Sequence, residues 1–306
     1  LRVLKASRPP SNPLDVLSWD LPAALSSAQL VHIHQAFTRC GEVGMLVAKQ
    51  QRKPICVSDH GGGTSPLVDR LGALELADRI IAYSDFGASL YRTRKHIDVI
   101  KGGVNAAHFA PPSSRPARDR VLFVGRLLPH KGIDQLIRAL PPELPLTICG
   151  RPYHNEYLAL LKSLAVGKQV EFVVDASDET LRSLYARAWA TVLPSVYQDC
   201  FGNTHVAPEL MGFTLLESMA CGTPAIASRT GGMPEFIDEG WTGFVFDYPD
   251  ELTGQLRLLA REPGLADEMG RRARKRVEEE YDLRVAGARL MAVYENLIAQ
   301  YEEVAA

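Results

Sequence analysis

The sequence predicts an α/β protein with two domains, each built around a mostly parallel sheet. Short apolar runs alternate with amphipathic stretches along most of the chain, which is the pattern of βαβ units. One stretch breaks that alternation: APPSSRPARDR at residues 110–120 combines Pro, Ser and Arg without periodicity and is typical of a linker. The length of 306 residues also favours two domains over one.

Each apolar run is predicted to be a strand and each amphipathic stretch a helix. The expected strands are residues 2–6, 30–34, 54–58, 79–84, 96–100, 121–125, 146–150, 170–174, 190–195 and 223–228. The expected helices between them include residues 132–140, 155–165, 178–188 and 213–220. A tight turn at residues 241–243 should enter a final strand, and two long charged helices, residues 251–263 and 264–306, should close the chain.

The composition argues against several classes of protein. Hydrophobic residues make up 46% and charged residues 23% of the chain, which is ordinary for a soluble globular protein. The net charge of −2 gives no basic field, so we expect no nucleic-acid partner. The five cysteines lack Cys-x-x-Cys spacing, and no signal peptide or membrane-spanning run is evident. We therefore expect reduced thiols and a cytoplasmic location.

The segment ELMGFTLLE, residues 209–217, carries two carboxylates eight positions apart around a glycine. Gly212 is predicted to open a helix, so the amides of Met211 to Thr214 should form an anion-binding helix N-terminus. Glu209 and Glu217 would repel a phosphate, but carboxylates accept hydrogen bonds strongly from sugar hydroxyls. The alternative is a helix start that is merely stabilised by nearby acidic residues.

Two further loops follow predicted strands. In VLFVGRLLPHKG, Arg126 and Lys131 follow a strand and suit a diphosphate, although two solvated surface cations are an equal alternative. In VSDHGGGTSP, His60 precedes the glycines 61–63, which would let the backbone approach a ligand. A flexible loop with an incidental histidine explains that segment equally well. Of His32 and His34, one is expected in the core or at a sheet edge.

Together these loops favour a nucleotide-sugar: amides and cations for the phosphates, and one glutamate each for the ribose and the transferred sugar. A nicotinamide-dependent dehydrogenase is disfavoured because the chain has no G-x-G-x-x-G. The segments VLFVGRLLPHKG, VLPS and PELMGFTLLESMACGTPAIASRTGGMPEFIDEGWTGFVF resemble family 4 of the retaining glycosyltransferases, which have the GT-B fold. The resemblance runs from about residue 79 to residue 246.

This resemblance implies two Rossmann-like domains with a cleft between them. Residues 1–112 would form the acceptor-side N-terminal domain, and residues 113–306 the C-terminal domain that binds the nucleotide-sugar. The last helix is a candidate to pack back on the N-terminal domain. Because the family's first strand and glycine-rich loop have no counterpart here, the N-terminal domain is expected to be incomplete.

The resemblance also implies roles for individual residues. Arg126 and Lys131 would hold the diphosphate, and Glu209 would contact the donor sugar and help organise the transition state. Glu217 would bind the ribose, and His60 would contact the donor sugar near the reaction centre. The remaining donor-binding positions would act through their main chain: Met211, Gly212, Phe213 and Thr214 at sugar and phosphate oxygens, and Gly150 and Ala176 at the base.

Two segments depart from the family's pattern. Residues 196–207, VYQDCFGNTHVA, replace a compact acidic-Pro-Phe-Gly segment and are interpreted as an insertion of unassigned role. Gly102-Gly103-Val104-Asn105 stands where Asn-Gly-Val-Asp is common.

The site residues and the resemblance together imply a retaining hexosyltransferase that uses a nucleotide-diphosphate sugar. The acceptor is left open among a sugar, a lipid-linked glycan and a small molecule, as are the donor base, the sugar, the oligomeric state and a peripheral membrane association. Two alternatives are a GT-B-type sugar-nucleotide epimerase and a non-catalytic nucleotide-sugar binding protein. We expect no cofactor and no metal site, since the chain contains no Asp-x-Asp pair for a divalent cation.

Overall fold

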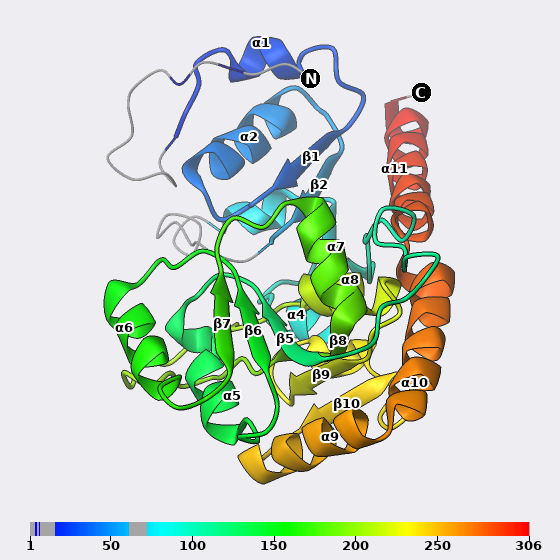
Figure 1. Ribbon diagram of the computed structural model, residues 1–306. Coiled ribbons are helices and arrows are strands. Elements are labelled where there is room, and N and C mark those ends of the chain that lie inside the picture. Colours follow the sequence, from blue (N-terminus) through cyan, green and yellow to red (C-terminus); the bar gives the residue numbers. More distant parts are fainter. Residues whose placement is uncertain (1–3, 5, 7–15, 61–71, 306) are drawn as a thin grey trace. The chain divides into compact units, whose positions relative to one another are not determined.

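The computed structural model describes residues 4, 6, 16–60 and 72–305 (Figure 1). It divides into two compact units, the first comprising Leu1–Ile100 with Gly287–Ala306 and the second comprising Lys101–Ala286. The glycines 61–63 and most of the predicted strand at residues 2–6 lie outside the described residues. The predicted domain limits, 1–112 and 113–306, stay a prediction about folding units.

The first unit contains a four-stranded parallel sheet in the order β1-β2-β3-β4. Its strands are β1 (Val31–His34), β2 (Ile55–Ser58), β3 (Arg79–Ala82) and β4 (Ile97–Val99), and its helices are α1 (Leu21–Leu25), α2 (Arg39–Gln50), η2 (Ala73–Leu76) and α4 (Asp85–Ser89). Side chains alternate along β1, so Val31 and Ile33 enter the hydrophobic core while His32 and His34 share the opposite face.

The second unit contains a six-stranded parallel sheet in the order β10-β9-β8-β5-β6-β7. Its strands are β5 (Arg120–Val124), β6 (Leu146–Cys149), β7 (Val170–Val173), β8 (Ala188–Leu193), β9 (Ala225–Ser228) and β10 (Gly243–Phe246). The chain adds β6 and β7 on one side of β5 and then returns to add β8, β9 and β10 on the other. The strand order therefore reverses between β5 and β8, which is where ligands bind in open sheets of this kind.

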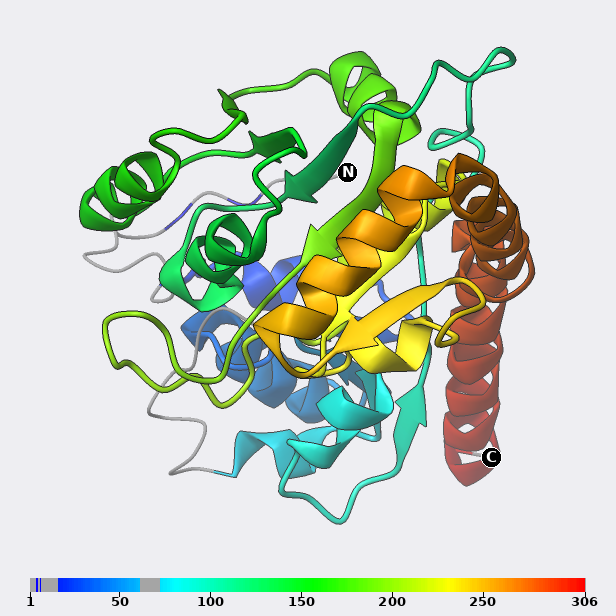
Figure 2. The ribbon, with the colours of Figure 1, turned by 60° about the horizontal axis from the view of Figure 1, so that its bottom comes forward.

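Helices connect these strands in the way that the sequence predicts. The helices are η3 (Pro129–Lys131), α5 (Ile133–Ala139), α6 (Asn155–Leu164), α7 (Asp178–Arg187), α8 (Phe213–Ala220), η4 (Met233–Phe236), α9 (Pro249–Arg261) and α10 (Pro263–Arg276). Helix α7 contacts β5 and β8, α8 contacts β8 and β9, and α9, orange in Figure 2, lies against β10. The expected strands from residue 30 onward and the expected helices up to residue 220 are confirmed.

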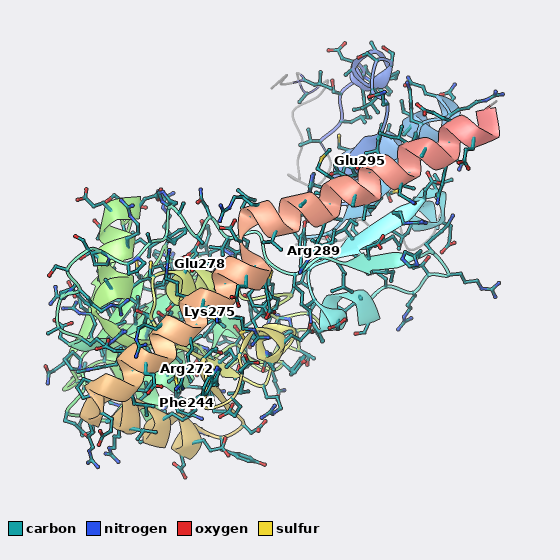
Figure 3. The ribbon with its side chains drawn as sticks, turned by 90° about the vertical axis from the view of Figure 1, so that its right-hand side faces the viewer. Phe244, Arg272, Lys275, Glu278, Arg289 and Glu295 are labelled. Carbon is teal, nitrogen blue, oxygen red and sulfur yellow. The ribbon has the colours of Figure 1, made fainter. Side chains whose placement is uncertain are left out.

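The prediction of one helix over residues 264–306 is wrong. Helix α10 ends at Arg276, a π-helical turn covers Val277–Tyr281, and α11 (Leu283–Ala305) begins after Asp282 (Figure 3). Asp282 is extended and its carboxylate accepts hydrogen bonds from the backbone N–H groups of Arg284 at 2.9 Å and Ala106 at 3.2 Å. A distant backbone donor therefore helps to fix the break, and helical periodicity carries no signal for it.

No helix in the described part of the chain combines the length and apolar character that crossing a bilayer requires. All five cysteines are free thiols, which agrees with the expectation of reduced side chains.

The two adjacent glycines that precede Val104 have different surroundings and provide a test of this packing. Both have positive φ, +103° at Gly102 and +107° at Gly103. A Cβ at Gly102 would lie 2.5 Å from the Cα of Tyr281, whereas a Cβ at Gly103 would meet no atom within 4 Å. We predict that Gly102→Ala lowers the free energy of unfolding by about 2 kcal/mol more than Gly103→Ala, because only the first adds an overlap to the shared backbone strain. Urea unfolding of both variants measures the difference, and equal losses would contradict the packing described here.

Candidate functional site

The candidate residues of the second unit lie along the carboxyl edge of its sheet, on both sides of the point where the strand order reverses. Arg126 follows the end of β5, and Gly150 follows β6. The loop after β8 carries Glu209 and leads into α8. Because the carboxyl ends of parallel strands lie along one edge of a sheet, segments far apart in the sequence meet there.

A pocket of about 350 Å³ opens beside the ends of β5 and β6. Its lining includes three residues that the sequence predicts for donor binding, namely Arg126, Gly150 and Ala176. Gly150 has φ +155°, and a Cβ there would lie 1.8 Å from the carbonyl oxygen of Gly125, so a glycine is required for this close approach. The pocket's rim carries an ion pair between Arg151 and Asp175.

Lys131 and Glu209 form an ion pair beside this edge, with side chains only 11% and 13% exposed. Lys131 ends the short helix η3, whose C-cap is Gly132, and Glu209 lies in the loop before α8. The carbonyl of Glu209 accepts a hydrogen bond from the N–H of Gly232 at 3.1 Å, which fixes the loop's backbone. The structure therefore brings together Lys131, which is predicted to bind the diphosphate, and Glu209, which is predicted to bind the sugar.

Helix α8 begins as predicted. Gly212 is its N-cap in the left-handed conformation, with φ +84°, and no side chain caps the helix. The backbone N–H groups of its first turn therefore keep the partial positive charge of a helix N-terminus. Met211 and Gly212 are buried and Thr214 is half-buried, whereas the side chain of Phe213 is exposed.

Glu217 lies one turn further along α8 and contacts a residue that the sequence did not indicate. The hydroxyl of Tyr185 on α7 donates a hydrogen bond to its carboxylate at 2.8 Å. Burial raises the pKa of Glu217; the hydrogen bond from Tyr185 opposes that change. Tyr185 was missed because it forms part of the apolar face of α7, where a tyrosine is indistinguishable from an ordinary core residue.

The segment at residues 196–207 folds as a small ordered loop. Gln198 and Thr204 form an isolated antiparallel bridge, and the buried carboxylate of Asp199 accepts hydrogen bonds from the N–H groups of Phe201 and Asn203. His205 lies 2.9 Å from the same carboxylate. Burial opposes ionisation, but these hydrogen bonds outweigh it and lower the pKa of Asp199 to about 2. The ionised carboxylate of Asp199 thus holds the segment together through these hydrogen bonds.

His60, the remaining candidate, belongs to the first unit and follows β2. It is exposed, and its Nε2 lies 2.9 Å from Nδ1 of His34 and 3.0 Å from the hydroxyl of Tyr83. The sequence did not indicate a link between His60 and His34, but the structure places their ring nitrogens within hydrogen-bond distance. The adjoining glycines 61–63 lie outside the described residues.

No group of three or more His, Cys, Asp and Glu side chains in the described ranges has a geometry that could hold a metal ion. The neighbouring side chains of His32, His34 and His60 do not have such a geometry either.

Residues 105–276, more than half of the chain, match the family of glycosyl transferases group 1. The chain belongs to this family, and the family recognised from the sequence is confirmed. Among solved structures, Anabaena HepE in complex with UDP superposes with a TM-score of 0.75 at 18% identity, over 90% of this chain and 81% of that chain. A glycosyltransferase from Rickettsia africae gives a TM-score of 0.76 at 17% identity, over 96% and 84%. These likenesses, with the two parallel sheets, establish the predicted GT-B fold.

Curated relatives are similar to parts of this chain. The GDP-mannose-dependent alpha-(1-6)-phosphatidylinositol monomannoside mannosyltransferase of Mycolicibacterium smegmatis is 32% identical over 66% of this chain and 57% of its own length. The alpha-maltose-1-phosphate synthase of the same organism is 28% identical over 94% of this chain and 84% of its own length. The chain spans little more than half the length of the first of these relatives.

The contact between Tyr185 and Glu217 can be tested by titration. We predict that Tyr185→Phe raises the pKa of Glu217 further, because the buried carboxylate loses its donor while its burial remains. A carboxyl whose folded pKa is raised holds its proton more tightly in the folded state, so its contribution to stability falls as the pH rises from 4.5 through the folded pKa. In Tyr185→Phe this fall should extend to higher pH.

The measurement is the ¹³C chemical shift of the Glu217 carboxyl followed across pH, with Glu217→Gln identifying the signal. An unchanged or lowered midpoint in Tyr185→Phe would show that the hydroxyl does not stabilise the carboxylate.

Proposed function

We propose that the protein transfers a hexose from a nucleotide-diphosphate sugar to an acceptor hydroxyl, with retention of the anomeric configuration. The observation that carries this proposal is the placement of the buried Lys131–Glu209 pair in the loops that surround the uncapped N-terminus of α8. A cation and helix amides suit a diphosphate, and a carboxylate suits the hydroxyls of the sugar attached to it. The names of similar proteins support the donor class, since one is GDP-mannose-dependent and another was solved with UDP-glucose.

In the proposed complex, Arg126, Lys131 and the amides of Met211 to Thr214 contact the diphosphate. Lys131 and the amides neutralise the charge that develops on the leaving group, which is the largest contribution in many enzymes. Glu217 accepts hydrogen bonds from the ribose hydroxyls, and the base occupies the pocket beside Gly150 and Ala176. When the donor binds, the ion pair between Lys131 and Glu209 opens. Lys131 then contacts the phosphate, and Glu209 accepts hydrogen bonds from the sugar.

Retention is proposed to follow from front-face substitution. The bond from the anomeric carbon to the phosphate oxygen breaks while a bond from the acceptor oxygen forms on the same face. The acceptor's proton passes to the departing phosphate oxygen, so that no enzyme nucleophile is needed. His60 contacts the donor sugar in this proposal, as the resemblance to the family implies. The acceptor is a hydroxyl compound: a sugar, a lipid-linked glycan or a small molecule.

The proposal is tested by incubating the protein with UDP-, GDP- and ADP-hexoses and a panel of acceptors. Release of nucleoside diphosphate that depends on an acceptor, with a product of retained configuration by NMR, is the expected result. An inverted product would overturn front-face substitution. A changed sugar without acceptor would identify an epimerase, and donor binding without turnover would identify a binding protein.

The two glutamates should separate binding from turnover. We predict that Glu217→Ala weakens free nucleoside diphosphate and nucleotide-sugar alike, because both contain the ribose. Glu209→Ala should leave the affinity for free nucleoside diphosphate nearly intact and abolish most turnover. Loss of a charged hydrogen bond costs about 1.5–3 kcal/mol, a change of about tenfold or more in affinity. Calorimetric titration of both variants provides the measurement, and equal losses of nucleotide affinity would refute these roles.

Lys131 and metal ions provide a second test. We predict that Lys131→Ala weakens nucleoside diphosphate at least about tenfold, while the affinity for the nucleoside changes little. Lys162→Ala, which removes an exposed cation from α6, is the matched control and should change neither affinity. Excess chelator should also leave both affinities unchanged, because the proposed site neutralises the diphosphate without a metal. Loss of nucleotide binding on chelation, restored by magnesium or manganese, would contradict this part of the proposal.

A further inference from the structure

A chain of hydrogen-bonded polar side chains lies at the carboxyl ends of β1, β2 and β3 in the first unit. In order, its members are Tyr294, His32, Ser58, His34, His60 and Tyr83. Five of the six come from the first 83 residues, and Tyr294 comes from the part of α11 that belongs to the same unit.

The backbone brings these side chains together. His32 and His34 are two residues apart on β1, so they point to the same face, and their ring centroids are 4.1 Å apart. His34 pairs with Ser58 in the parallel register of β1 and β2, and Ser58 pairs with Ile81 of β3. Tyr83 follows β3 at the same edge.

His60 is held at one nitrogen of its ring and at its backbone. Its Nε2 contacts Nδ1 of His34 at 2.9 Å and the hydroxyl of Tyr83 at 3.0 Å. Its backbone N–H donates to Oε1 of Gln35 at 3.0 Å. Within the described residues no hydrogen bond to Nδ1 of His60 is found, so Nδ1 is the ring atom left for a ligand.

The three histidine rings in this series of hydrogen-bonded side chains stay uncharged near neutral pH. Burial, followed by the proximity of His34 and His60, lowers the pKa of His32 to about 4. Burial also lowers the pKa values of His34 and His60. Tyr83 keeps its hydroxyl proton, because burial raises its pKa. A second proton on any one ring would place a positive charge against a neighbouring ring.

We propose that His34 and Tyr83 are positioning residues that hold His60 in one neutral tautomer and one ring orientation, with Nδ1 presented to a hydroxyl group of the substrate. The inference rests on the proposed function only for the identity of that substrate, a donor sugar. The holding of the ring is a property of the first unit by itself.

The contact between His34 and His60 requires one proton between the two nitrogens. If His34 donates it, the proton of neutral His60 resides on Nδ1, which then donates to the substrate. If His60 donates it, Nδ1 is bare and accepts from the substrate. The hydroxyl of Tyr83 contacts the same Nε2 and keeps its proton. Because a phenol hydroxyl is a stronger donor than acceptor, it favours the first arrangement, with Nε2 bare and the proton of His60 on Nδ1, whereas an unrestrained imidazole would offer a mixture of both.

The holding of the ring is tested by NMR of the protein with ¹⁵N-labelled histidine. Long-range ¹H–¹⁵N correlations distinguish a protonated from a bare ring nitrogen, and His60→Gln identifies the signals of His60. We expect one dominant neutral tautomer in the wild type and a mixture in His34→Leu and Tyr83→Phe. His34→Asn should restore much of the preference, because its side-chain amide places a polar atom close to the position of Nδ1.

Matched controls in the same unit remove comparable groups elsewhere. Tyr301→Phe deletes a hydroxyl that donates to Asp78, and His96→Leu deletes a ring that contacts Asp98. Neither should change the tautomer of His60. A mixed tautomer in the wild type, or one unaffected by His34→Leu and Tyr83→Phe, overturns the proposal.

Kinetics then test whether this orientation serves the reaction. We expect kcat to fall about tenfold in His34→Leu and Tyr83→Phe, with KM for the donor changed less than about twofold, and partial recovery in His34→Asn. Unchanged kcat despite a mixed tautomer would overturn the catalytic use of the orientation. If the wild type transfers no sugar to any acceptor, the proposed function fails, and the NMR comparison still decides whether His34 and Tyr83 hold His60.

Discussion

The largely buried ion pair between Lys131 and Glu209 constrains both the surrounding loops and the ligand that can bind beside them. The two side chains are only 11% and 13% exposed, and a largely buried charge without a partner is unfavourable. Any ligand that draws Lys131 away must also supply hydrogen-bond donors for Glu209. A simple phosphate satisfies only the first requirement. In the proposed function, a molecule that joins a phosphate group to several hydroxyls, as a nucleotide-sugar does, satisfies both requirements.

The backbone keeps this pair in place through glycines at positions of very close approach. A Cβ at Gly132, directly after Lys131, would lie 2.0 Å from the carbonyl oxygen of Pro194, and one at Gly231 would lie 2.0 Å from that of Glu209. Both have left-handed backbones, with φ of +64° and +59°. The loops after β5, β8 and β9 are thereby packed backbone to backbone. Such backbone packing leaves no room for side chains between these loops, and it fixes where Lys131 and Glu209 enter the site. Catalytic electrostatics depends on charges placed in this way before a ligand arrives.

The sequence predicted the features that depend on local chemistry. Gly212 predicted the start of α8, because a glycine before a periodic apolar run is typical of a helix N-terminus. The apolar runs before Gly125 and Gly150 predicted the strand ends there. The partners of the site residues were out of reach. Tyr185 meets Glu217 across two helices, and Asp282 breaks the final helix with the help of Ala106, 176 residues away. Such contacts are set by tertiary packing, to which periodicity and propensity are blind.

His34 shows the limit most clearly. The sequence predicted one of His32 and His34 in the core or at a sheet edge, whereas the structure places both on the same face of β1. The contacts of His34 depend on its register with Ser58 and on His60, which follows β2 and lies within 2.9 Å. The two units consequently carry different polar chemistry. The second unit gathers full charges and helix amides, which suit the ionised part of a nucleotide-sugar, whereas the first gathers imidazoles and hydroxyls held neutral by burial and by one another. A neutral, directional group discriminates among hydroxyls by hydrogen-bond geometry without competing for the diphosphate. In the proposed reaction this division lets the charged groups bind the leaving group while His60 orients the uncharged sugar that is transferred.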